Sequence, residues 1–204
     1  MSRELVVASG NRDKAAEVAK LLADTSWRIR TLADYPPVEE PEEDGETFEE
    51  NALLKARYYV AAVGAPCVAD DSGLEVDALN GAPGVYSARY AGESCSYADN
   101  NAKLLRELAL RELAAHGEEK SRRARFLCCA VYVDPEGTEL VAVGSVEGHI
   151  AAEPRGANGF GYDPVFIPEG FDATFGELAP ETKHAISHRS RALQQLRDLL
   201  AGLE

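Results

Sequence analysis

The chain has 204 residues and a formal net charge of −14 at pH 7. This length suits one domain, expected over residues 1–204, that is large enough to bury a substantial core. An acidic surface disfavours nucleic-acid or anionic-membrane partners, because those partners require positive charge. The sequence has no apolar run approaching the roughly 20 residues of a membrane-spanning helix, so we expect no membrane partner.

The cysteines show neither a metal-site pattern nor a disulfide framework. Cys67, Cys95, Cys128 and Cys129 have no C-x-x-C spacing, and the last two are adjacent, so they face opposite sides if they lie on a strand. We interpret them as reduced, mostly core residues of a cytoplasmic protein. The amino terminus passes directly into a short apolar run without a signal-peptide pattern, so secretion is not expected.

The first elements in chain order alternate between strand and helix. A buried strand is predicted over residues 5–9, a turn over 10–13 and a helix over 14–22, because apolar residues recur there at helical period. Residues 29–32 predict a second strand. The segment 35–45 is rich in proline and acidic residues, which predicts a loop.

A helix start signal follows that loop. Thr47 and Glu50 have the spacing of a capping box, in which each side chain accepts a hydrogen bond from the other residue's backbone. Apolar residues then continue at helical period as far as Tyr59. The sequence therefore predicts a helix that begins directly after Thr47.

Two adjacent carboxylates, Asp70 and Asp71, follow a short apolar run over residues 67–69. Because Ser72 and Gly73 come next, we expect the strand to end at the acids and a turn to begin. Proteins of the α/β class bind ligands at the carboxyl ends of their strands. The alternative is a turn without function, since Asp, Ser and Gly are ordinary turn residues.

The second half of the chain predicts a helix, a hairpin, a short strand and a final helix. The elements are a helix ending near Gly117, strands over 126–133 and 140–146 joined by a turn at 134–137, a strand over 164–167, and a helix with Leu193, Leu196, Leu199, Leu200 and Leu203 on one face. Helices alternate with strands first and a hairpin follows. The fold class is therefore α/β with a mixed sheet.

The first strand, turn and helix have the geometry of a phosphate site. Ser9, Gly10 and Asn11 form the turn and Lys14 follows in the helix. Backbone N–H groups at a helix start face an anion, and the lysine adds positive charge. The segment lacks the Walker A pattern. A plain strand–turn–helix is the alternative interpretation.

The acidic loop over residues 35–45 and the segment around Phe160 each allow two interpretations, one with a function in binding and one without. The acidic loop is either a solvated charge run or, if it folds over Asp70 and Asp71, a source of metal ligands, because Mg²⁺ binds one or two carboxylates together with substrate phosphates. Phe160 and Tyr162 alternate with glycines. They form either a stacking platform or a tight turn into the next strand.

Several cations lie just before or at the start of the final helix. Lys183, His188 and Arg189 are there beside Ser187. Positive charge is unfavourable at the positive end of a helix dipole, so this placement suggests an anionic or carbonyl-bearing ligand. Solvated basic residues are the alternative.

Together these segments resemble the inosine triphosphate pyrophosphatase family, which comprises non-canonical purine nucleoside triphosphate pyrophosphatases. The matching motifs, in the expected order along nearly the whole chain, are Ser9-Gly10-Asn11-x-x-Lys14, Thr47-Phe48-Glu49-Glu50-Asn51-Ala52-x-x-Lys55-Ala56, Ala69-Asp70-Asp71-Ser72-Gly73-Leu74, Gly81-Ala82-Pro83-Gly84-x-Tyr86-Ser87-Ala88-Arg89, Phe160-Gly161-Tyr162-Asp163 and Ser187-His188-Arg189.

The resemblance implies a two-lobed fold around a long mixed β-sheet flanked by helices, with the active site in the cleft between the lobes. It also implies a homodimer, and Mg²⁺-dependent hydrolysis of XTP, ITP and dITP to the monophosphate and pyrophosphate. Such an enzyme removes these nucleotides from the cellular pool.

The resemblance also implies a role for each matching residue. Asp71 is the general base and a metal ligand, together with Glu42 or Glu43. The residues implied to bind substrate are Ser9, Gly10, Asn11, Arg12, Asp13, Lys14 and Lys55 at the phosphates, Ser72, and Phe160, Gly161, Tyr162, Asp163, Lys183, His188 and Arg189 at the base. The chemistry of the residues alone does not choose between Asp70 and Asp71 as the base.

Two alternatives of different kinds accompany this interpretation. One is a Maf-like pyrophosphatase, which acts on other modified or pyrimidine nucleotides. The other is a non-catalytic nucleotide sensor, which binds nucleotide without metal-dependent turnover. Product analysis across a panel of nucleotides separates all three.

Overall fold

The computed structural model describes residues 3–23, 25–114 and 121–203. Within these residues a six-stranded sheet has the order β2-β1-β3-β4-β5-β6. The strands are β1 (Glu4–Val7), β2 (Arg28–Thr31), β3 (Cys67–Val76), β4 (Arg123–Val133), β5 (Glu139–Ile150) and β6 (Phe166–Pro168). Pairing is parallel from β1 to β2 and β3 but antiparallel from β5 to β6, which confirms the predicted mixed sheet.

The helices are α1 (Arg12–Leu22), α2 (Phe48–Val63), α3 (Tyr97–Ala114), α4 (Pro180–Ile186) and α5 (His188–Ala201). The chain forms two compact units. The first comprises Met1–Asp71, Cys128–Gly144 and His188–Glu204, and the second comprises Ser72–Leu127 and Ser145–Ser187. In the described part of the chain, no helix is long and apolar enough to cross a membrane.

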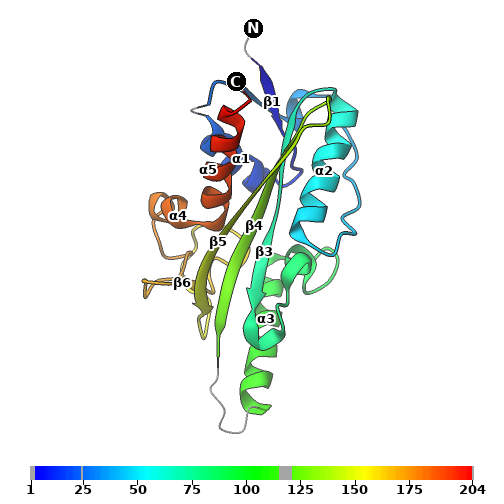
Figure 1. The fold of residues 1–204 in the computed structure, drawn as a ribbon. Helices are drawn as coiled ribbons and strands as arrows, with labels where there is room; N and C mark the ends of the chain where they lie inside the picture. Colours follow the sequence, from blue (N-terminus) through cyan, green and yellow to red (C-terminus); the bar gives the residue numbers. More distant parts are fainter. Residues whose placement is uncertain (1–2, 24, 115–120, 204) are drawn as a thin grey trace. The chain divides into compact units, whose positions relative to one another are not determined.

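The first unit has a helix layer on each face of its strands. One buried cluster packs α1 and α5 against the sheet and includes Leu5, Val18, Leu22, Val68, Cys128, Leu193 and Leu196. The other packs α2 against the sheet and includes Val6, Ala52, Ala56, Tyr59, Cys67, Ala69 and Cys129. Figure 1 shows α1 and α5 on one side of β1 and α2 on the other. Neighbouring residues of one strand therefore face different helices.

The vicinal cysteines follow this alternation. Cys128 packs in the cluster of α1 and α5, whereas Cys129 packs in the cluster of α2. Both thiols are free, as are those of Cys67 and Cys95. The prediction that the adjacent pair faces opposite sides of a strand is confirmed.

The second unit has a core rich in aromatic rings. Leucines from α3 pack there with phenylalanines from β4, β6 and the loop after β6, and the members include Leu104, Leu108, Phe126, Phe166 and Phe175. The rings of Phe126 and Phe166 meet edge to face with their centroids 4.7 Å apart. Such pairs stabilise a core beyond the area that they bury.

Local sequence signals explain why α2 lies where it does. Thr47 Oγ1 accepts a hydrogen bond from the Glu50 amide at 3.1 Å, and the Glu50 carboxylate accepts one from the Thr47 amide at 3.2 Å. The predicted capping box is therefore confirmed. The helix ends at Gly64, whose φ of 68° is a left-handed conformation that glycine adopts without a Cβ clash.

The prediction that a strand ends at the acidic pair is wrong. Strand β3 continues through Asp70 and Asp71 to Val76. The physical reason is that Leu74 and Val76 are buried in the core of the second unit, so the backbone stays extended to deliver them. The alternative interpretation of this segment as a turn is therefore also wrong.

The predictions for the carboxyl-terminal helices are confirmed in part. Leu193, Leu196 and Leu200 are buried as predicted, but Leu199 is 42% exposed, because it lies off the buried stripe of α5. The short helix α4, which carries Lys183, was not predicted. The predicted helix end near Gly117 lies outside the residues that the structure describes.

Candidate active site

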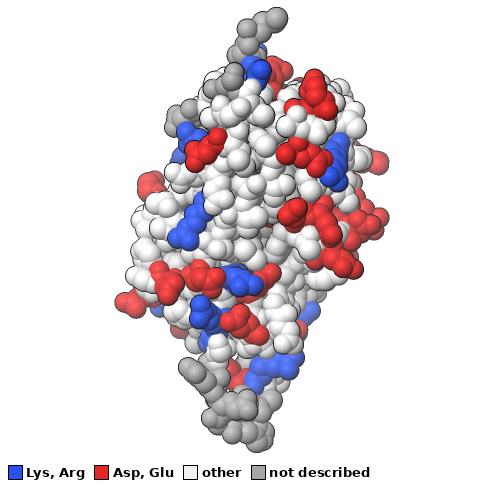
Figure 2. Space-filling model, in the orientation of Figure 1, with Lys and Arg blue, Asp and Glu red and all other residues white. Residues whose placement is uncertain are grey.

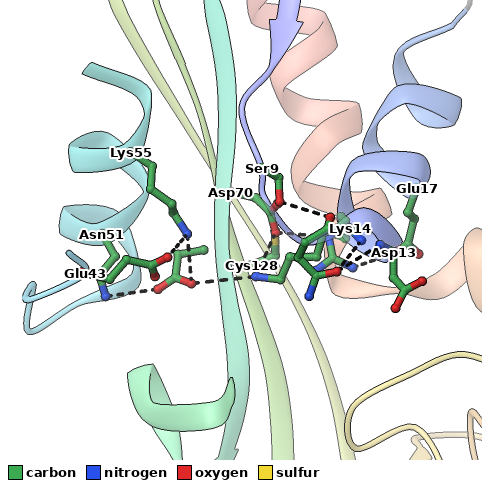
Figure 3. A network of polar contacts seen from close by, with 12 residues as sticks. Ser9, Asp13, Lys14, Glu17, Glu43, Asn51, Lys55, Asp70 and Cys128 are labelled. Carbon is green, nitrogen blue, oxygen red and sulfur yellow. Dashed lines mark hydrogen bonds and ion pairs between the residues drawn. The ribbon is translucent and has the colours of Figure 1, made fainter. Parts of the chain in front are cut away.

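The two adjacent aspartates of β3 have hydrogen-bond partners on different helices. Figure 3 shows Asp70 together with Lys14 and Cys128. On the side of α2, the Asn51 side-chain amide donates a hydrogen bond to Asp71 Oδ2 at 3.3 Å. On the side of α1 and α5, Arg189 Nε donates to Asp70 Oδ2 at 3.2 Å. Strand alternation thus gives the two carboxylates different partners and permits them different roles.

Lys14 reaches both carboxylates from the start of α1. Its Nζ lies 3.9 Å from Asp70 Oδ2 and 3.9 Å from Asp71 Oδ1, with the side chain 17% exposed. Asn11 caps the helix, because its Oδ1 accepts hydrogen bonds from the amides of Asp13 and Lys14 at 3.0 and 3.2 Å. Ser9 Oγ donates to the Asn11 carbonyl at 3.4 Å. The predicted phosphate turn therefore lies beside the acidic pair.

Lys55 joins the acidic loop to Asp71. Its Nζ lies 3.3 Å from Glu43 Oε1 and 3.5 Å from Asp71 Oδ1, and the residue is 8% exposed. The loop is also fixed through Asn51 Oδ1, which accepts a hydrogen bond from the Gly45 amide at 2.8 Å. Of the two glutamates implied as metal ligands, Glu43 is thus held at the site and Glu42 is exposed.

The pKa values of the two aspartates shift in opposite directions. Burial raises the pKa of Asp71 above its ordinary value, and the ammonium groups of Lys55 and Lys14 offset this only in part. Burial acts in the same direction on Asp70, but Lys14 and Arg189 outweigh it and hold the pKa of Asp70 well below its usual range. Asp71 is therefore the carboxylate with the greater proton affinity.

Arg189 is buried against acids of the first unit. Its guanidinium contacts Asp70 and also Glu17 of α1, and the residue is 2% exposed. Cys128 adds its thiol, whose Sγ donates to Asp70 Oδ2 at 3.8 Å. Arg189, implied by the resemblance to line the base, is thus placed on Asp70 in this structure.

The donor set fits a hard divalent cation. Glu43 and Asp71 both reach Lys55 Nζ, and Asp70 Oδ1 is buried without a hydrogen-bond partner among the described residues. In the described ranges, no group of three or more His, Cys, Asp or Glu residues is arranged so that it could hold a metal ion. One or two carboxylates completed by phosphate oxygens is the arrangement that Mg²⁺ favours.

The second unit has another cluster of polar side chains, which packs against the aromatic ring of Phe160. Asp163 Oδ2 accepts hydrogen bonds from the Phe160 amide at 2.7 Å and from Lys183 Nζ at 2.6 Å. That ammonium lies 4.9 Å from the centroid of the Phe160 ring, and the Tyr97 ring centroid lies 6.1 Å from the same ring. The carboxylate therefore fixes both the cation and the ring.

The other residues implied to bind substrate differ in their burial and in their hydrogen-bond partners. Tyr162 is buried and its hydroxyl donates to the Ser87 carbonyl at 2.9 Å, which makes it a core residue. The carbonyl of Gly161 accepts from the Asn101 side chain at 3.0 Å. Ser72 is half-buried in β3 and His188 is 5% exposed at the start of α5. The side chain of Arg12 lies outside what the structure describes.

Two residues of this network, Asn51 and Glu17, had been given no role at the site from the sequence. Asn51 lies four residues before Lys55, and Glu17 lies three residues after Lys14. Residues at these spacings share a helix face. Once Lys55 and Lys14 are assigned to the site, their helical spacing therefore identifies Asn51 and Glu17 as its neighbours.

Comparisons with known proteins show the family to which the chain belongs. The model of the Ham1 family matches residues 5–199. The dITP/XTP pyrophosphatase of Nocardia farcinica is 50% identical over 98% of this chain and 95% of its own length, and that of Geobacter sulfurreducens is 48% identical over 98% of both.

Solved structures show the same fold. A HAM1 protein from Coxiella burnetii superposes with a TM-score of 0.86 at 42% identity, over 98% of this chain and 99% of its own. The Ham1 protein of Staphylococcus aureus gives 0.85 at 41% identity, over 99% and 100%. Because sequence and fold agree along nearly the whole length, the chain belongs to the Ham1 family.

Proposed function

We propose that this protein hydrolyses the non-canonical purine nucleoside triphosphates XTP, ITP and dITP to the monophosphate and pyrophosphate, with Mg²⁺ as cofactor. The observation that carries the proposal is the convergence of Lys14, Lys55, Asp71 and Glu43 beside the turn at the start of α1. Two lysines and two carboxylates supply the phosphate binding and the base that phosphoanhydride hydrolysis needs. Relatives named dITP/XTP pyrophosphatase, about half identical along the whole chain, support the substrate class.

The contacts suggest a separate role for each residue of the site. Lys14 and the amides of the turn bind phosphate oxygens, and Lys55 adds positive charge from α2. Asp71 accepts the proton of the attacking water, a role that suits the carboxylate with the raised pKa. Asp71 and Glu43 would hold the metal, and the bound metal would neutralise charge on the phosphates. Asn51 orients Asp71 by its hydrogen bond.

Base recognition is assigned to the polar group of the second unit. Phe160 offers a ring on which any base stacks, and Lys183 offers N–H donors held by Asp163. Hypoxanthine and xanthine carry a 6-oxo acceptor, whereas adenine carries a 6-amino donor. A donor of the protein is therefore paired with ITP and XTP but left unpaired with ATP, which disfavours ATP.

The test is pyrophosphate release from XTP, ITP, dITP and the four ordinary ribonucleotides, each with Mg²⁺ and with a chelator. We expect release from the first three that stops when the metal is removed. Full activity in chelator contradicts the metal assignment. Preference for the pyrimidine nucleotides of the panel indicates a Maf-like enzyme, and nucleotide binding without pyrophosphate release indicates a sensor.

We also propose, from the family resemblance, that the protein is a cytoplasmic homodimer. Light scattering on the purified chain measures the assembly, and a mass of one chain at working concentration contradicts the dimer.

Replacing Lys14 by alanine is expected to raise the KM for ITP by about tenfold or more, because a charge-assisted contact to phosphate is lost. Lys20→Ala is the matched control, since it removes an exposed lysine of the same helix. Steady-state kinetics measure both variants. Equal KM values for the two would place Lys14 outside phosphate binding.

Phe160→Ala is expected to weaken ITP, XTP and GTP binding alike, by about 1 to 3 kcal/mol, because stacking tolerates every base. Tyr97→Ala is a useful comparison, since its ring lies at 6.1 Å from that of Phe160 on the same aromatic group. Binding of non-hydrolysable analogues measures the effect. A loss confined to one base shows that Phe160 acts in discrimination instead.

A further inference from the structure

One carboxylate of the acidic loop lies directly on the phosphate turn. Oε1 of Glu40 is 1.4 Å from the position that a Cβ on Gly10 would occupy, and Cδ is 2.5 Å from it. The two residues are far apart in sequence, so the loop before α2 folds back over the turn between β1 and α1. The end of the Glu40 side chain therefore fills the space that the missing side chain of Gly10 leaves open.

The contact depends on the absence of a side chain at Gly10 and not on an unusual backbone conformation there. Its φ lies outside the left-handed range in which glycine is needed for its backbone. A Cβ at this position would displace the Glu40 carboxylate from the turn. Gly10 is also a residue to which we assign phosphate binding, so Glu40 occupies the approach to that turn.

The contact is made by a side chain that has room to move. Glu40 is an exposed residue, and it touches Gly10 with the flexible end of its side chain. Glu43, three residues later, is tied to Lys55 instead. Rotation of the Glu40 side chain into solvent thus clears Gly10 without disturbing the contact between the loop and α2.

The surrounding surface is acidic as well. Figure 2 shows acidic side chains gathered over the amino-terminal end of α2, where Glu46, Glu49 and Glu50 are exposed. An anion approaching this part of the first unit therefore meets negative charge. Repulsion of this kind acts on the bare anion and is relieved when a divalent cation neutralises it.

We propose that Glu40 is a charge gate on the phosphate turn, which disfavours metal-free polyphosphate and promotes loss of the pyrophosphate product. The proposal rests on the function proposed above, because it assumes that the turn binds phosphate. A nucleotide that arrives with its metal carries less charge and displaces the Glu40 side chain more easily. Released pyrophosphate without metal is expelled by the returning carboxylate.

The experiment compares Glu40→Gln with Glu39→Gln, the same charge change at the adjacent exposed position of the loop. Binding of inorganic pyrophosphate to the full chain in chelator is measured by calorimetry. We expect Glu40→Gln to bind it about three- to tenfold more tightly than the original chain, the effect of removing one nearby like charge in a largely solvated site. Glu39→Gln is expected to change the affinity by less than about twofold.

Equal affinities for the two variants, weaker binding by Glu40→Gln, or no detectable binding by any of the three proteins would overturn the gate. Hydrolysis of ITP by the same preparations is measured in parallel. Hydrolysis with unchanged pyrophosphate affinity rejects the gate and keeps the proposed function. Failure of the original chain to hydrolyse ITP, XTP or dITP rejects the proposed function itself.

Discussion

Asp71→Asn is expected to lower kcat for ITP by at least about a hundredfold while the fold is retained. An amide neither accepts the proton of the attacking water nor ligates Mg²⁺ well. The side chain keeps its shape, and Asn51, Lys55 and Lys14 still surround it. Steady-state kinetics at saturating ITP and metal measure the loss, and circular dichroism checks the fold.

Asp198→Asn is the matched control, because it makes the same change at an exposed position of α5. Its kcat is expected to stay within about twofold of the original, since surface substitutions away from a site have small effects. A kcat for Asp71→Asn in the same range would remove Asp71 from the chemical step.

Asp70→Asn is expected to affect stability more than chemistry, with a loss of about 3 kcal/mol in the free energy of unfolding. The variant leaves the buried Arg189 guanidinium with one carboxylate fewer, and Glu17 alone then compensates its charge. Urea denaturation measures the loss. The matched comparison is Glu139→Gln, which breaks an exposed pair with Arg57 and is expected to cost at most about 1 kcal/mol.

The stability difference between the original chain and Asp70→Asn is expected to decrease as the pH falls. The pKa of Asp70 is lowered in the folded state, so its contribution to stability is present above the unfolded-state value of about 4 and is lost as pH falls below it. The stability gap between the original chain and Asp70→Asn should therefore shrink on acidification below about pH 4. A gap that is constant down to pH 2, or a variant as stable as the original at pH 7, would show that the ion pair does not stabilise the fold.

Local signals in the sequence predicted the parts of the site that depend on short spacing. Asn11 and Lys14 lie within one turn of the start of α1, so their position at the amino-terminal end of that helix followed from helix geometry alone. Thr47 and Glu50 placed the start of α2, and the position of Lys55 on that helix followed from it. These predictions needed no information about distant residues.

Predictions that depend on tertiary packing failed or stayed open. The continuation of β3 beyond Asp71 is set by the burial of Leu74 and Val76, which a small-residue pattern at Ser72 and Gly73 does not reveal. The different partners of Asp70 and Asp71 depend on which helices cover each face of β3. The contact of Arg189 with Asp70 joins residues 119 positions apart, so no local pattern contains it.

Phosphorus-31 NMR of XTP incubated with the protein and Mg²⁺ tests the central claim most directly, because it identifies the bond that breaks. The account predicts pyrophosphate and the monophosphate in equimolar amounts from the first turnover, with no nucleoside diphosphate as an intermediate. Because pyrophosphate has two equivalent phosphorus atoms, its signal has twice the area of the monophosphate signal. Orthophosphate appearing together with the nucleoside diphosphate would show cleavage at the terminal phosphate, and would contradict the assignment of this site as a pyrophosphatase.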